Sequence, residues 1–156
     1  MTIKRILVPV DYSEHSARAL AYAAALAEHF GSKLEVIHVW DRPLYVPETA
    51  TVAHPSGQGR ASLSELIAEN AEREMQEFLD RCELPPSVQL THHLIAGEPS
   101  AKILEFARGG YQLLVLGTHG RAGVRHLLLG SVAERVLRLC PIPVLTVPGD
   151  RATHEA

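Results

Sequence analysis

Two patterns of apolar and polar residues follow one another along this chain, one typical of buried strands and the other of amphipathic helices. Short apolar runs, which predict strands, lie at 6–10, 34–39, 113–116 and 143–147. Apolar residues at helical spacing lie between and after them, at 17–27, 63–82, 103–107 and 132–140. Strands that alternate with helices predict an α/β fold with a parallel sheet.

A further predicted strand, from Val88 to Ile95, differs because its apolar residues alternate with polar ones such as Gln89 and Thr91. This alternation predicts that one face meets solvent and that the strand lies at an edge of the sheet. With right-handed crossovers, the strand order 3-2-1-4-5 satisfies this constraint. We therefore predict a single domain over residues 1–148, an open five-stranded parallel sheet with helices on both faces, followed by a polar tail at 149–156.

The periodic pattern disappears between Asp41 and about Arg60, where prolines and glycines are frequent. We predict a loop of roughly twenty residues without a regular element there. Loops of this length are often lids or binding loops, and a variable insertion is the alternative.

Composition and charge exclude several classes of protein. The 156 residues carry a net charge of −3, which provides no basic field for nucleic acid. No apolar run is long enough to span a membrane, and the first residues are charged too early for a signal peptide. Cys82 and Cys140 fall at core-facing helical positions, so buried thiols are favoured over a disulfide. We expect a cytoplasmic protein without membrane insertion or a nucleic-acid partner.

The stretch from Leu116 to Val132 contains the chemistry most typical of a binding site. A predicted strand ends at Gly117, glycines recur at 120 and 130, and Ser131 opens a helix. Bare backbone N–H groups and the positive end of a helix dipole would then face one volume suited to phosphate. The alternative is that Ser131 and Glu134 form a capping box and Gly130 only turns the chain. Positive charge could come from Arg121, Arg125 and His126.

Asp11 follows the first predicted strand and would lie beside Gly117 in the predicted sheet. The order 3-2-1-4-5 makes the gap between the first and fourth strands the topological switch point, where ligands of open α/β sheets bind. An acid there could accept hydrogen bonds from a base or ribose, or help to hold Mg²⁺. The alternative is an aspartate that caps the following helix, for which Ser13 and Ser16 are also candidates.

Several enzyme classes lack their motifs in this chain. The sequence contains no GxxxxGK[ST] and no GxSxG, and the turn from Asp11 to Glu14 is not GxGxxG. The strand ending at Ile95 is not followed by the aspartate of a phospho-acceptor domain. His92 and His93 would point to opposite faces of a strand, and no histidine has ligand-type neighbours at metal spacing, so we propose no metal site. Binding is therefore favoured over catalysis.

Three stretches resemble the universal stress protein family, and the likeness covers about residues 3–148. They are KRILVPVDYSEHSARAL from Lys4, EVIHVW from Glu35, and GTHGRAGVRHLLLGSVAERVLRLCPIPVLTV from Gly117. The motif G-x2-G-x9-G-[ST] is complete, as in the ATP-binding branch of that family. One departure is Tyr111-Gln112, where many members have Ala-Asp before the fourth strand.

The resemblance implies a Rossmann-like fold of the adenine nucleotide alpha hydrolase type that binds ATP, ADP or AMP, with or without Mg²⁺. It also implies a homodimer that pairs its fifth strands, Val144 to Val147, and an unidentified protein partner. The implied nucleotide-binding residues, none of them catalytic, are Pro9, Val10, Asp11, Val39, Gly117, Thr118, His119, Gly120, Arg121, Gly130, Ser131 and Val132.

Three functions stay open. The first is an ATP-binding stress-response regulator that acts as a homodimeric sensor or switch. The second is a slow ATPase or phosphotransferase that uses Asp11 or a histidine, and the third is a nucleotide-free dimeric scaffold. The first is favoured because the glycines have no accompanying catalytic base.

Overall fold

The fold alternates strands and helices as the hydrophobic pattern predicts. The computed structural model describes residues 2–40, 50–57, 59–118 and 129–148. The strands are β1 (Arg5–Val10), β2 (Lys33–Trp40), β3 (Thr51–Ala53), β4 (Arg60–Ser62), β5 (Leu90–Ala96), β6 (Leu113–Gly117) and β7 (Val144–Val147). The helices are α1 (Glu14–Phe30), α2 (Leu63–Arg81), α3 (Pro99–Ala107) and α4 (Ser131–Leu139). None of the described helices is long and apolar enough to cross a membrane.

Five of the strands form one parallel sheet in the order β5-β2-β1-β6-β7. Counting only these five strands along the chain, the order is 3-2-1-4-5, so the predicted fold class and topology are confirmed. The alternating strand also lies at an edge, as predicted, because β5 pairs only with β2 in this sheet. The neighbours β1 and β6 therefore flank the switch point of the sheet.

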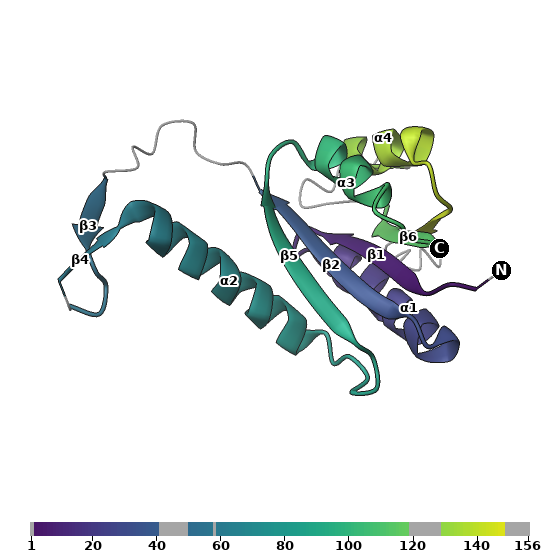
Figure 1. Cartoon of the computed structure of the whole chain (residues 1–156), viewed down its shortest axis with the longest axis horizontal. Helices are drawn as coiled ribbons and strands as arrows, with labels where there is room; N and C mark the ends of the chain where they lie inside the picture. Colours follow the sequence, from purple (N-terminus) through teal and green to yellow (C-terminus); the bar gives the residue numbers. More distant parts are fainter. Residues whose placement is uncertain (1, 41–49, 58, 119–128, 149–156) are drawn as a thin grey trace, which may run out of the picture.

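Helices cover both faces of the sheet, which explains why its central strands are apolar on both sides (Figure 1). One core cluster joins the sheet to α1 and α2 and includes Val8, Val36 and Phe78. The other joins the opposite face to α3 and α4 and includes Leu7 and Ile37. Successive residues of β1 and β2 therefore belong to different cores, as the two-residue period of a strand requires.

The region predicted to be an irregular loop between 41 and 60 contains regular structure, so this prediction was wrong in its second half. β3 and β4 pair antiparallel in a hairpin, which lies beyond the sheet at one end of α2 (Figure 1). Gly57 and Gly59 have positive φ values of 77° and 80°. These glycines permit the tight turn between the two strands instead of preventing regular structure. Residues 41–49 and 58 lie outside the described residues.

The long amphipathic helix is confirmed as α2, but only part of its predicted apolar face is buried. Met75 and Phe78 are fully buried against the sheet, whereas Leu63, Ile67 and Ala71 are half-buried. The amino-terminal half of α2 therefore leaves apolar surface accessible.

The two cysteines are free, as predicted. Contrary to the prediction, neither is fully buried. Both stand at the carboxyl-terminal caps of helices, Cys82 after α2 and Cys140 after α4, where they are half-buried. A cap lies at the end of a helix, and the core therefore covers only one side of each residue. Burial nevertheless raises the pKa of the Cys82 thiol, with nearby Arg81 opposing the effect.

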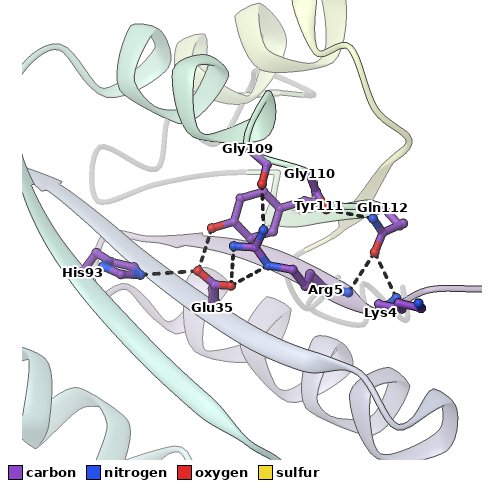
Figure 2. Close-up of polar contacts among 8 residues, drawn as sticks. All are labelled: Lys4, Arg5, Glu35, His93, Gly109, Gly110, Tyr111 and Gln112. Atoms are coloured by element: carbon purple, nitrogen blue, oxygen red, sulfur yellow. Dashed lines mark hydrogen bonds and ion pairs between the residues drawn. The ribbon is translucent and has the colours of Figure 1, made fainter.

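A polar network joins β1, β2, β5 through His93, and the segment that precedes β6 (Figure 2). The Glu35 carboxylate accepts hydrogen bonds from Arg5 Nε at 2.8 Å and from Tyr111 Oη at 2.7 Å. Arg5 also lies over the Tyr111 ring, 4.3 Å from its centroid, and donates to Gly109 O. The Gln112 amide oxygen accepts from the backbone N–H of Arg5 at 2.9 Å. Tyr111-Gln112, the departure from the family pattern, thus anchors β6 to β1 and β2.

Glu35 should stabilise the fold in a pH-dependent way. Burial raises the pKa of its carboxyl, but hydrogen bonds from Tyr111 and Arg5 outweigh burial and hold it below the usual value. Burial, together with the hydrogen bond to the same carboxylate, raises the pKa of Tyr111 to about 12. Because the pKa of Glu35 is lower in the folded state, its contribution is present above the unfolded pKa and is lost as pH falls through the folded pKa.

We therefore expect Glu35→Gln to reduce the free energy of unfolding by about 1.5–3 kcal/mol at neutral pH. Urea denaturation at neutral and acidic pH measures this, and the difference from the native chain should disappear in acid. Glu105→Gln is the control, because Glu105 pairs with Lys102 at the surface and exposed pairs contribute about 0–1 kcal/mol. Equal losses in the two variants would contradict the prediction.

Candidate functional site

The turn from β1 into α1 places Asp11 at the carboxyl edge of the sheet. Its Oδ1 accepts hydrogen bonds from the backbone N–H of Ser13 at 3.2 Å and from Ser13 Oγ at 2.5 Å. Ser13 is the N-cap of α1, and its side chain accepts from the N–H of Ser16. Of the candidate caps, Ser13 is therefore the one used, and Asp11 orients it instead of capping the helix directly.

Tyr12, which the sequence patterns did not single out, shapes this turn. Its φ of 65° lies in the left-handed region, which is uncommon for a residue other than glycine. Arg81 at the end of α2 donates to Tyr12 O at 2.7 Å, and the Tyr12 ring stacks on His38 with centroids 4.1 Å apart. The only signal in the sequence is His38 itself, a polar residue inside an otherwise apolar strand.

The end of β6 and the start of α4 are held together on the other side of the switch point. The N–H of Gly130 donates to Thr118 O at 2.7 Å, and the N–H of Thr118 donates to Val147 O at 3.1 Å. Gly117, the last residue of β6, lies against the first turn of α1. A Cβ atom added to Gly117 would lie only 2.9 Å from His15 O. Gly117 therefore lets α1 approach the sheet closely.

The amino terminus of α4 has a different cap from the one predicted. Gly130 is the N-cap, with no side-chain cap hydrogen bond, and Ser131 is the first helical residue. The capping box of Ser131 and Glu134 is therefore wrong, because a Ser131 already inside the helix cannot accept at the cap position. Ser131 is exposed, so the start of this helix is accessible at the surface.

The predicted site residues that the structure describes all lie at the carboxyl edge, but they face different sides of the sheet. Val39 contributes to the core under α3 and α4, whereas Val10 contributes to the core under α1 and is 5% exposed. Pro9 shares the face of Val39 by strand alternation. Val10 could therefore meet a ligand only through its backbone. His119, Gly120, Arg121, Arg125 and His126 lie outside the described residues.

Among residues 2–40, 50–57, 59–118 and 129–148, no group of three or more His, Cys, Asp or Glu side chains could hold a metal ion. His92 and His93 lie on opposite faces of β5, as predicted, with His92 Nε2 2.6 Å from Glu72 Oε1 and His93 Nε2 3.4 Å from Glu35 Oε2. The carboxyl edge therefore offers backbone groups, a carboxylate and hydroxyls.

Comparison with known proteins identifies the family. The sequence model of the universal stress protein family matches residues 2–148. The chain belongs to the universal stress protein family. A universal stress protein of Methanocaldococcus jannaschii is 32% identical over 145 residues, covering 92% of this chain and 81% of the relative.

Solved structures of the family share the fold. A universal stress protein in complex with cAMP has a TM-score of 0.67 and 22% identity, covering 96% of this chain and 100% of that chain. The universal stress protein from Archaeoglobus fulgidus in complex with dAMP has a TM-score of 0.57 and 22% identity, covering 94% and 98%. At these identities the two structures establish a common architecture.

Proposed function

We propose that this universal stress protein binds an adenine nucleotide at the switch point and acts as a cytoplasmic regulator of the stress response. The observation that carries the proposal is the amino terminus of α4, which has no side-chain cap and is hydrogen-bonded to the end of β6. Such a terminus favours phosphate through its backbone N–H groups and the helix dipole. The cAMP and dAMP complexes of two relatives support adenine as the base.

The described residues fit distinct parts of a nucleotide. Backbone N–H groups at the start of α4 suit the phosphates, and the exposed Ser131 hydroxyl adds a donor there. The Asp11 carboxylate suits a ribose hydroxyl or a phosphate-bound Mg²⁺. We assign phosphate and ribose contacts to the motif residues Gly117, Thr118, His119, Gly120, Arg121, Gly130, Ser131 and Val132, and adenine contacts to Pro9, Val10 and Val39.

Nucleotide content tests the proposal directly. The purified protein is denatured and its supernatant chromatographed, and the refolded or nucleotide-stripped protein is titrated with AMP, ADP and MgATP by calorimetry. We expect saturable binding of at least one of these nucleotides. Absence of adenine nucleotide from the supernatant together with flat titrations would reject the site and leave the nucleotide-free scaffold.

Asp11 distinguishes binding from catalysis. We expect Asp11→Ala to raise the Kd for AMP by about tenfold or more, the effect of losing one hydrogen bond to a charged acceptor. Phosphate release from MgATP should stay at background in the native protein. Asp80→Ala is the control, because Asp80 is exposed and its carboxylate only accepts a hydrogen bond from the Gln76 side chain within α2. Turnover that disappears in Asp11→Ala would instead favour the slow ATPase or phosphotransferase.

We also propose that the regulator is a homodimer paired through β7, which would transmit the nucleotide state to an unidentified protein partner. β7 is an edge strand, and Leu145 on it is 37% exposed. Unpaired edge strands are templates for pairing with another chain. We expect Leu145→Lys to shift a sedimenting dimer to monomer. Val52→Lys, at an equally exposed apolar side chain on β3, should leave the dimer intact. A native protein that sediments as a monomer would contradict the proposal.

A further inference from the structure

A pocket of about 340 Å³ lies between the carboxyl end of β2 and the amino-terminal half of α2. Its walls include His38 and Trp40 of β2, which share the α2 side of the sheet. Val39, assigned above to adenine, belongs to the opposite core. The pocket therefore lies on the other face of the sheet from the side chains of Pro9 and Val39. Val10 lies on the same side as the pocket and would contact adenine only through its backbone. Its volume is at the lower end of the range for small-molecule sites, about 300–1,000 Å³.

One wall of this pocket is aromatic and held in place. The rings of Tyr12 and His38 stack with an interplanar angle of 26°. The His38 ring is oriented by a hydrogen bond between its Nδ1 and Val10 O at 2.8 Å, and the Tyr12 backbone is oriented by Arg81. Because a carbonyl only accepts, this bond requires a proton on Nδ1. These two oriented rings provide an aromatic surface for a flat molecule, and Trp40 lines the same side of the pocket.

The opposite wall comes from α2 and ends in a negative charge. Leu66, Ile67 and Ala71 supply aliphatic surface, in the part of α2 that is incompletely covered by the sheet. Asn70 and Glu74 also line the pocket, and the Asn70 amide donates to Glu74 Oε1 at 3.1 Å. The Glu74 carboxylate favours a cationic group over a carboxylate, but only modestly, because Glu74 is exposed and the Arg73 guanidinium donates to the neighbouring Asn70 side chain.

We infer that this pocket is a second ligand site, for a flat aromatic compound that carries an ammonium group. The aromatic body would lie between the His38–Tyr12–Trp40 wall and the aliphatic residues of α2, with its ammonium beside Glu74. This site does not depend on the proposed nucleotide function, because none of its side chains is among the predicted nucleotide residues.

Trp40 provides a direct reporter, since it is the single tryptophan of the chain. In ¹H–¹⁵N spectra of the full chain, its indole N–H resonance is followed during titration with naphthylmethylamine. The charge-reversed probe is naphthylacetate. We expect a saturable shift with the amine and weaker binding of the acid, by up to about fivefold, the effect of one partly exposed ion pair. Absence of a saturable shift with the amine would overturn the inference.

Matched variants locate the binding. Ala71→Leu should fill the pocket and abolish the shift, whereas Ala68→Leu, on the exposed side of the same helix, should not. Glu74→Gln should remove the preference for the amine, and Glu69→Gln should retain it. Equal behaviour of either pair would refute the site. Saturating AMP should leave the Kd for the amine unchanged. Displacement of the amine by AMP would show that the pocket is part of the nucleotide site and would refute a second site.

Discussion

Gly117→Val is expected to reduce the free energy of unfolding by about 1–3 kcal/mol, the range for overpacking a close contact. A Cβ atom at this position would lie 2.9 Å from His15 O and 3.0 Å from His15 C. Both are backbone atoms of α1, so the contact cannot be relieved by a side-chain rotation. The helix must move away from β6, which disrupts the core that α1 shares with Val115. Urea denaturation measures the loss.

Ala101→Val is the control for this substitution, because Ala101 is exposed in the first turn of α3. We expect that variant to change the unfolding free energy by less than about 1 kcal/mol. A Gly117→Val protein as stable as the control would show that α1 does not constrain this glycine.

Gly130→Val, the second substitution with a large expected effect, should abolish nucleotide binding while the protein stays folded. Gly130 has φ −72° and ψ 155°, an extended conformation that valine also adopts. Its N–H can still donate to Thr118 O. The isopropyl group would instead occupy the volume beside the first N–H groups of α4, where we place phosphate. Loss of two charge-assisted hydrogen bonds predicts an AMP Kd raised by about 100-fold or more.

Calorimetric titration with AMP measures this effect, and urea denaturation establishes that the variant is folded. The stability cost should stay within about 1 kcal/mol, because valine is a poorer N-cap than glycine. Ala101→Val again provides the control and should bind AMP with native affinity. An unchanged Kd in folded Gly130→Val would remove the start of α4 from the site.

The two glycines of one motif are therefore expected to respond differently to the same side chain. Gly117 is constrained by the α1 backbone, whereas Gly130 is a half-buried helix N-cap followed by the exposed Ser131. Glycine spacing alone suggests one shared role in binding phosphate. The packing separates a glycine required for folding from a glycine whose role is to leave space for a ligand.

Much of the architecture follows from patterns within short stretches of sequence. Continuous apolar runs identify the central strands, because a strand buried on both faces has no polar side. The alternation around Leu90 places β5 at the edge for the complementary reason. Together with the handedness of crossovers, these local patterns determine the strand order and hence the position of Asp11 and Gly117 at the switch point.

The predictions from sequence were wrong where a local pattern is compatible with more than one backbone structure. Glycines and prolines between 41 and 60 are compatible with an irregular loop and equally with the turn of the β3–β4 hairpin. An S-x-x-E pattern is compatible with a cap at Ser131 and also with a helix whose cap is one residue earlier, at Gly130. The backbone conformation around each segment selects between them, and spacing does not report it.

The sequence by itself determined the α/β class, the strand order and the family, because these depend on periodicity and motif spacing, and it predicted where the candidate site lies. Only the tertiary structure decided how Arg81 holds Tyr12 in a left-handed turn and how Tyr111 meets Glu35, contacts between residues 69 and 76 positions apart. The pocket beside Trp40 likewise forms between β2 and α2, which come together only in the folded chain. Such contacts depend on how elements pack, and no spacing along the chain encodes them.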